Sequence, residues 1–147
     1  MSFSIITATF NSEDTILKTI ESVKSQKFVI YEHIFIDGGS TDSTVKIIKE
    51  NAENFILISE KDDGIYDALN KGLLKSSKKY VAILNSDDCF AASNVLSSVY
   101  DKFETSECSI VYSGIEYVDK NLNVAGRWIP GIYHHGDFLD KAWHPPH

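Results

Sequence analysis

The chain has only two cysteines in 147 residues, Cys89 and Cys108, and they form neither a C-x-x-C pair nor a spacing typical of metal ligands. This scarcity argues against a disulfide-stabilised scaffold. Isolated cysteines are most often small core residues, so we expect both to be buried. A chain without a disulfide framework suits the reducing cytoplasm.

Long hydrophobic runs are also missing, and no segment is apolar enough to span a bilayer. The first residues, MSFSIITATF, lack the basic region and apolar stretch of a signal peptide. We therefore expect a cytoplasmic protein. The sequence has no internal repeat, low-complexity tract or linker, and its length predicts a single domain.

Basic residues are too few for a nucleic-acid surface. Fourteen Lys and Arg stand against 21 Asp and Glu, which gives a net charge of −7 and predicts no nucleic-acid partner. An anionic ligand is still compatible with this charge, because a metal ion can mediate the contact. The chain lacks G-x-G-x-x-G spacing and a Walker lysine, so it has no phosphate-binding fingerprint.

What the sequence does contain is an alternation of apolar strands and amphipathic helices. The β-branched and aromatic segments that predict strands are 3–10, 29–37, 54–60 and 80–85. Helices are predicted between them, and Ile65, Leu69 and Leu73 mark the apolar side of the third. Nearly all-apolar strands that alternate with helices predict an α/β fold with a mostly parallel sheet covered on both faces.

The pattern changes after residue 88. Residues 91–103 predict a helix, and 108–119 with 122–129 predict a β-hairpin that turns at 119–121. The remaining segment is rich in aromatic residues, His and Pro, and we expect much of it to pack against the domain or a partner. The spacing of His134, His135, His144 and His147 fits no zinc motif, so ordinary surface or partly buried histidines are favoured.

Four polar turns follow the predicted strands, at residues 9–11, 37–42, 60–63 and 85–88. Right-handed crossovers place all strand-to-helix turns of a parallel sheet at one edge. Ligands of open α/β sheets bind at this carboxyl edge. The turns therefore predict a binding site.

The last of these turns carries two adjacent acids, Asp87 and Asp88, directly after the apolar run 81–84. A hard divalent cation is typically held by one or two carboxylates, with a substrate diphosphate completing its shell. The alternative is that the acids cap a helix beginning near Ala91. The other turns also have plain interpretations, since DGGSTD can cap a helix and EKDDG can be a solvated turn. The expected gathering of all four turns favours a site.

Four motifs together resemble family 2 glycosyltransferases, in particular the branch that builds bacterial surface polysaccharides. They are SIITATFN, FIDGGSTDST, SEKDDGIYDALNKGL and AILNSDD, in the order and spacing of that family. The resemblance is dense over residues 4–88 and loose afterwards. It implies a GT-A, Rossmann-like fold, with residues 1–88 as the donor-binding half and 89–147 as the incomplete start of the acceptor-side half.

The resemblance also implies the site. The residues implied to bind the nucleotide sugar are Ala8, Thr9, Phe10, Asp37, Asp62, Asp63, Asn70, Asn85 and Ser86. Asp87 and Asp88 would hold Mg²⁺ or Mn²⁺ against the diphosphate. Two residues depart from the family pattern: Gly38 replaces a frequent second acid, and Asn85 replaces the first Asp of the metal motif.

The implied activity is transfer of a sugar from a UDP-, GDP- or dTDP-linked donor to a surface-polysaccharide or lipid-linked acceptor, with inversion. Family members generally run well beyond 147 residues, so we expect the catalytic base beyond His147 and assign no catalytic residue. None of the later acids, Glu116, Asp119, Asp137 and Asp140, lies in a recognisable base motif.

Two other functions remain open. The chain could bind nucleotide and metal without transferring sugar, or it could be a metal-dependent phosphoryl enzyme, which the lack of a nucleophile and phosphate loop disfavours. We also expect peripheral association with the inner face of the cytoplasmic membrane. Self-association is expected if residues after 147 normally cover the sheet.

Overall fold

A computed structural model describes residues 1–121 and 123–131 of the chain. It forms two compact units, Met1–Glu104 and Thr105–His147. In the described ranges, no helix has both the length and the hydrophobicity needed to cross a membrane. The assignment of donor and acceptor halves stays a prediction.

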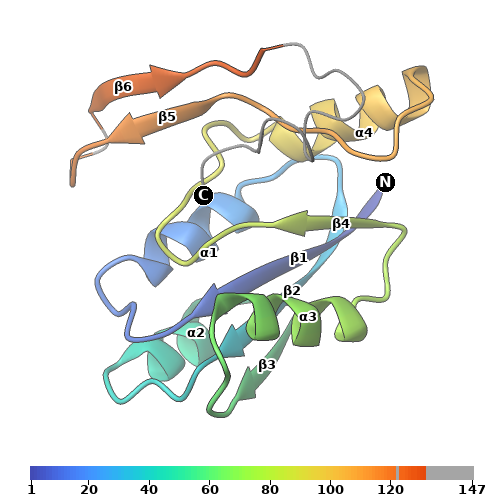
Figure 1. The fold of residues 1–147 in the computed structure, drawn as a ribbon. Coiled ribbons are helices and arrows are strands. Elements are labelled where there is room, and N and C mark those ends of the chain that lie inside the picture. The colour runs from blue at the N-terminus through green and yellow to red at the C-terminus, as the bar shows by residue number, and fades with distance from the viewer. Residues whose placement is uncertain (122, 132–147) are drawn as a thin grey trace. The chain divides into compact units, whose positions relative to one another are not determined.

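The first unit is built on a four-stranded sheet whose order is β3-β2-β1-β4 (Figure 1). Its strands are β1 (Ser2–Thr9), β2 (Ile30–Asp37), β3 (Phe55–Ser59) and β4 (Tyr80–Ile83). All three strand pairs are parallel, and Thr9 pairs with Asp37, which pairs in turn with Ser59. The predicted α/β fold with a parallel sheet is confirmed.

Helices cover both faces of this sheet. They are α1 (Ile16–Lys24), α2 (Thr44–Asn51), α3 (Ile65–Lys75) and α4 (Val95–Thr105). Neighbouring strand residues point to opposite faces, so Phe35 and Ile36 belong to different layers. Phe35 packs with Ile16 of α1 and Ile48 of α2, whereas Ile36 packs with Ala68 of α3. The helices thus form one layer on each face of the sheet.

The predicted apolar side of α3 is wrong at Ile65 and Leu73, whereas Leu69 is partly buried. Ile65 is exposed and Leu73 is 54% exposed, while the residues that α3 buries are Ala68 and Gly72. The reason is a close approach between helix and sheet: a Cβ atom at Gly72 would lie 2.4 Å from Cγ2 of Ile6. Small residues therefore form the contact, and the larger apolar ones lie beside it.

Three local predictions are also corrected. Cys89 and Cys108 are both exposed, because they lie in irregular segments that flank α4 rather than on a core-facing strand or helix. Helix α4 begins at Val95 instead of near Ala91, so Asp87 and Asp88 do not cap it. The alternative interpretation of that acid pair is thereby removed.

The described part of the second unit contains a hairpin of β5 (Ile115–Val118) and β6 (Val124–Trp128). The strands are antiparallel, and Ile115 pairs with Trp128. Asp119 shapes the turn, since one of its carboxylate oxygens accepts hydrogen bonds from the backbone N–H groups of Asn121 and Asn123. The predicted hairpin is confirmed. The predictions for the four C-terminal histidines and for packing of the final segment lie outside the described residues.

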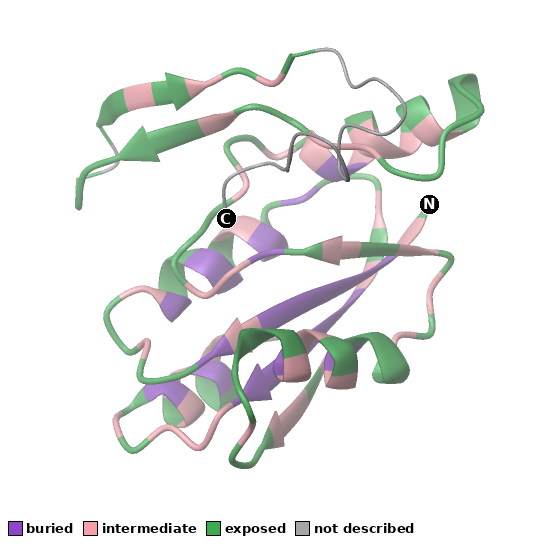
Figure 2. Cartoon of the chain, in the orientation of Figure 1, coloured by how far each residue is buried: buried purple, intermediate pink, exposed green. Residues whose placement is uncertain are grey.

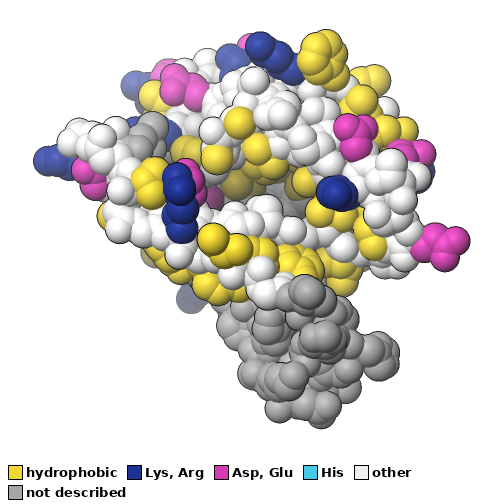
Figure 3. All heavy atoms as spheres, turned by 90° about the horizontal axis from the view of Figure 1, so that it is seen from above, with side chains coloured by type: hydrophobic (Ala, Val, Ile, Leu, Met, Phe, Trp, Pro, Cys, Tyr) yellow, Lys and Arg dark blue, Asp and Glu magenta, His cyan; other side chains and the backbone are white. Residues whose placement is uncertain are grey.

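Burial falls off toward the edges of the sheet (Figure 2). Strands β1 and β2 are mostly buried, whereas Val81 and Ile83 on the edge strand β4 are 41% and 58% exposed. Hydrophobic side chains also reach the surface among charged ones on the face drawn in Figure 3. Exposed apolar side chains on an edge strand are a recognised hazard for strand-to-strand association. The sequence-based expectation of self-association stays a prediction.

Near the amino ends of the strands, a buried carboxylate fastens the α3–β4 loop. Glu32 accepts hydrogen bonds from Ser4 Oγ at 2.6 Å, Ser77 N at 2.7 Å and Ser77 Oγ at 2.9 Å. Lys78 Nζ lies 3.7 Å from it. Burial works to raise the pKa of Glu32, but these hydrogen bonds and Lys78 together hold it below its ordinary value of 4.5.

We predict that Glu32→Gln destabilises the fold by about 1–3 kcal/mol, because the amide adds donors where Ser4 and Ser77 already donate. A carboxylate whose pKa is lowered by folding contributes stability above its unfolded pKa, and that contribution is lost as the pH falls. The difference in unfolding free energy between wild type and Glu32→Gln should therefore shrink between pH 6 and about pH 3. Urea unfolding at several pH values measures this difference. A difference that stays constant would contradict the role of the ionised carboxylate.

Candidate functional site

The turns at the carboxyl edge of the sheet are tied to one another, as predicted. The loop after β1 meets the loop after β2 through Asn11, whose backbone N–H donates to Ser40 Oγ at 2.8 Å and whose Oδ1 accepts from Thr41 N at 2.9 Å. Two residues further, Glu13 N donates to Asp42 Oδ2 at 3.1 Å. The loops after β1 and β2 therefore form one connected rim.

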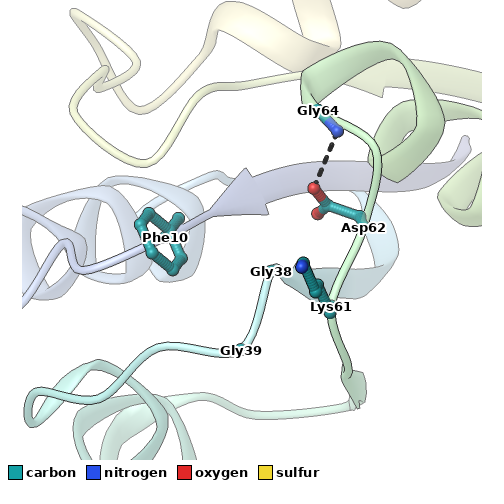
Figure 4. Close-up of a pocket in the computed structure, with 6 residues that line it drawn as sticks. All are labelled: Phe10, Gly38, Gly39, Lys61, Asp62 and Gly64. Carbon is teal, nitrogen blue, oxygen red and sulfur yellow. Dashed lines mark hydrogen bonds between the residues drawn. The ribbon is translucent and has the colours of Figure 1, made fainter.

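A pocket of about 480 Å³ lies at this rim (Figure 4). Its lining comes from three loops and consists of Phe10, Gly38, Gly39, Lys61, Asp62 and Gly64. The Phe10 side chain is 60% exposed, which leaves an aromatic ring free to stack on a planar ligand. Asp62 Oδ1 accepts a hydrogen bond from Gly64 N at 2.9 Å. The pocket thus offers an aromatic surface, one carboxylate and one lysine.

Asp37 lies beneath this rim rather than in the pocket lining. It is completely buried, and its carboxylate accepts hydrogen bonds from Ser40 N at 3.0 Å, from Ser40 Oγ, and from Ser59 Oγ at 2.6 Å. These bonds hold the β2–α2 loop against β3. Its register neighbour Thr9 has the one buried side-chain oxygen, Oγ1, that lacks a hydrogen-bond partner within the described ranges.

The turn with Asp87 and Asp88 is anchored to α1. The buried hydroxyl of Thr19 lies 3.0 Å from the carbonyl oxygen of Ser86 and 2.9 Å from that of Asp88. Ser86 Oγ lies 2.9 Å from Ser12 Oγ, and Ser12 belongs to the same loop as Phe10. The pocket and the acid turn therefore border one loop.

The electrostatics of the acid turn suit a cation. Partial desolvation, and then the charge of Asp87, raise the pKa of Asp88, although Asn85 Nδ2 donates to Asp88 Oδ2 at 3.3 Å. Two adjacent carboxylates that disfavour each other's charge are relieved by a divalent ion. Among the described residues, no group of three or more His, Cys, Asp or Glu side chains could hold a metal. Two acids are nevertheless enough for Mg²⁺ or Mn²⁺ when a diphosphate supplies further oxygens.

The remaining predicted binding residues do not all line the pocket. Phe10 and Asp62 line the pocket, whereas Ala8 packs against the α3-side core. Asp63 and Asn70 are exposed and are not among the lining residues. Their assignment as binding residues stays a prediction.

Sequence reasoning missed Lys61 in the pocket and the polar side of α1. Thr19, Ser22 and, just beyond the end of α1, Gln26 recur at helical spacing. Thr19 holds the acid turn itself, and Ser22 and Gln26 hold the segment that follows it. Gln26 Nε2 donates to Ala92 O at 2.7 Å, and its Oε1 accepts from Leu96 N at 3.1 Å. Small polar residues repeating beside the apolar positions of the helix were the signal that could have revealed this anchor.

We predict that Thr19→Val, which keeps the shape but removes the hydroxyl, destabilises the fold by about 1–2 kcal/mol. It should also weaken the metal-dependent nucleotide binding that the family resemblance implies, because the carbonyls of Ser86 and Asp88 lose their donor. Calorimetric titration and urea unfolding measure the two effects. The control is Thr15→Val on the preceding turn, where the hydroxyl donates to Ser12 O at 3.4 Å. Equal binding by the two variants would contradict an anchoring role for Thr19.

Comparison with known proteins places these features in context. The family model for glycosyl transferase family 2 matches residues 4–145. A relative in Mycobacterium tuberculosis, named an uncharacterized glycosyltransferase, is 36% identical over 100 residues, which cover 67% of this chain and 38% of the relative. The Escherichia coli protein WfaP, named a UDP-Glc:alpha-D-GlcNAc-diphosphoundecaprenol beta-1,3-glucosyltransferase, is 32% identical over 125 residues, 84% of this chain and 49% of WfaP. The chain thus spans half or less of these relatives.

Solved structures share the fold. Staphylococcus aureus TarS in complex with UDP-GlcNAc superposes with a TM-score of 0.67 at 26% identity, covering 73% of this chain and 32% of TarS. The mannosyltransferase PcManGT of Pyrobaculum calidifontis, solved with GDP-Man and Mn²⁺, has a TM-score of 0.62 at 22% identity, over 67% of this chain and 31% of PcManGT. The fold of the chain is the GT-A fold.

Proposed function

This chain belongs to glycosyl transferase family 2, and from that premise we propose that it binds a nucleotide-sugar donor at the carboxyl edge of its sheet for transfer to a glycan or lipid-linked acceptor. The observation that carries the proposal is the shared loop of residues 10–12. On one side it presents the Phe10 ring to the pocket, and on the other it contacts the turn with Asp87 and Asp88. The base and the diphosphate of one nucleotide need two binding sites that lie next to each other, and this loop borders two such sites.

The chemistry follows from this arrangement. Phe10 would stack on the base, and Asp87 and Asp88 would hold a divalent cation. The ion would supply charge neutralisation for the diphosphate and the departing nucleotide. We propose inversion at the anomeric carbon, with an acceptor hydroxyl attacking from the opposite face and passing its proton to a carboxylate base. No described acid is assigned as that base.

One relative supports a lipid-linked acceptor, because the name of WfaP specifies a diphosphoundecaprenol carrier. A carrier of that kind is embedded in a membrane. We therefore propose that the protein works at the inner face of the cytoplasmic membrane, through peripheral contact.

The direct test combines binding and turnover. The 147-residue chain is titrated calorimetrically with UDP, GDP and dTDP, with and without Mn²⁺, and is then incubated with the matching nucleotide sugars to measure nucleotide release. Mn²⁺-dependent binding of one nucleotide is expected. Binding without release would favour the alternative of a donor-binding module. Failure to bind any of the three nucleotides with Mn²⁺ present would overturn the proposed function.

A further inference from the structure

The turn between β3 and α3, residues 60–64, carries two of the residues that line the pocket, Lys61 and Asp62 (Figure 4). Little of this turn is buried, because Asp62 is half-buried and the other four residues are exposed. A segment with few buried apolar contacts opens easily unless polar contacts hold it. The order of this part of the pocket therefore depends on hydrogen bonds and ion pairs.

Lys71 of α3 reaches both ends of this turn. Its Nζ lies 3.0 Å from Oε1 of Glu60 and 3.0 Å from Oδ2 of Asp67. The same oxygen of Asp67 accepts a hydrogen bond from the backbone N–H of Asp63 at 3.2 Å. One ammonium group is thus tied directly to the first residue of the turn and, through Asp67, to the fourth. The hydrogen bonds to Glu60 and then to Asp67 raise the pKa of Lys71 above its ordinary value of 10.5, so the group stays charged.

The position of Lys71 is set by the core of the domain. Its side chain is more buried than those of both its acidic partners, Glu60 and Asp67. The next residue, Gly72, lies against the sheet, where a Cβ atom would come within 2.4 Å of Ile6 Cγ2. The ammonium group therefore extends from a part of α3 that cannot shift easily, and it transmits that position to the turn.

We propose that Lys71 is a positioning residue for the pocket: it holds residues 60–64 in the arrangement in which Lys61 and Asp62 line the pocket. Lys71 is not among the lining residues, so it acts through the turn. Its effect on ligand binding rests on the proposed function, whereas its effect on the turn is independent of any ligand.

A role in helix stability alone is the competing explanation. Asp67 and Lys71 are four residues apart on one helix, and such pairs stabilise an exposed helix slightly wherever they occur. That role does not involve Glu60, which precedes α3 at the other end of the turn. Glu60→Gln therefore removes the ion pair that spans the turn and leaves the pair within the helix intact.

Limited trypsin digestion of the native 147-residue chain measures the order of the turn, because Lys61 lies within it. The measured quantity is the initial rate of cleavage after Lys61, followed by mass spectrometry. Proteolysis of a locally opened segment follows the population of its open form. Lys71→Met should speed this cleavage about three- to tenfold, and Glu60→Gln should change it in the same direction. Lys71→Arg keeps a charged donor for both carboxylates and should restore a rate within about twofold of the wild type.

The matched control is Lys46→Met on α2, which removes an exposed lysine that is paired with Glu50 four residues on. It should leave cleavage after Lys61 unchanged. A second control is cleavage after Lys24, at the end of α1, in the Lys71→Met variant. An equal acceleration there would mean that the whole fold had loosened, and it would overturn the inference.

Cleavage after Lys61 at the wild-type rate in both Lys71→Met and Glu60→Gln would also overturn it. The second measurement is calorimetric titration with whichever of UDP, GDP and dTDP the wild type binds in the presence of Mn²⁺. Lys71→Met should bind that nucleotide about threefold or more weakly, because the apparent affinity falls with the fraction of molecules whose turn is in place. Lys71→Arg should recover most of this loss.

The two measurements keep the inference and the proposed function apart. Nucleotide binding of wild-type strength by Lys71→Met would overturn the inference and leave the proposed function standing. If the wild type binds none of the three nucleotides, the proposed function fails, and the cleavage rates after Lys61 still decide whether Lys71 positions the turn.

Discussion

Replacing Asp87 and Asp88 together by asparagine is expected to abolish Mn²⁺-dependent binding of the nucleotide. Even outer partners of metal ligands cost about 10- to 100-fold when they are mutated, so loss of both ligands should cost at least about 100-fold. The fold should survive, because the turn is held to α1 through the backbone carbonyls of Ser86 and Asp88. Calorimetry with and without Mn²⁺ measures the change.

The titration without Mn²⁺ gives the more discriminating prediction. Without Mn²⁺, two carboxylates next to a diphosphate repel it, so the asparagine variant should bind the nucleotide as well as the wild type or slightly better. The matched control, Glu50→Gln with Glu107→Gln, removes two exposed charges elsewhere and should behave as wild type in both arms. A variant that keeps its Mn²⁺ dependence would remove Asp87 and Asp88 from the cation site.

The sequence was sufficient for the arrangement of the sheet, because each strand is rich in β-branched and aromatic residues and is followed by a polar turn. Parallel pairing and the gathering of the turns follow from those two facts. Phe10 and Asp62 were recognised by motif, and the structure places both in the pocket lining. Asp37 was recognised by the same route, but its burial beneath Ser40 could not be read from a linear pattern.

Errors arose where packing distance, rather than periodicity, decides burial. The spacing of apolar residues in α3 points to Leu73, yet the helix meets the sheet through Gly72 because the two approach closely. Polar contacts in the core were equally difficult to predict from the sequence. His33 is buried with Nε2 at 2.9 Å from Thr7 Oγ1, and burial lowers its pKa to about 3, which keeps it neutral. An alternating polar residue on a strand is ordinarily assigned to a solvated face.

The contact between α3 and the sheet yields the second large prediction. Gly→Ala inside a helix usually stabilises it by roughly 0.5–1 kcal/mol, because glycine loses more backbone entropy on folding. At Gly72 we expect the opposite sign, a loss of about 1–3 kcal/mol, since the added methyl group would meet Ile6 Cγ2 in a closely packed core. Gly72→Val should cost more. Urea unfolding monitored by circular dichroism measures these changes.

Two further variants test whether the contact with Ile6 causes this loss of stability. Leu74→Ala, at an exposed position of the same helix, should change stability by less than about 0.5 kcal/mol. Ile6→Ala is destabilising alone, but it removes the atom that the new methyl group would meet, so its combination with Gly72→Ala should cost clearly less than the sum of the two single changes. Additive costs would show that Gly72 is needed for some reason other than its contact with Ile6. A stabilising Gly72→Ala would mean that α3 lies farther from the sheet in solution, and the pocket formed by the turn preceding α3 would have to be redrawn with it.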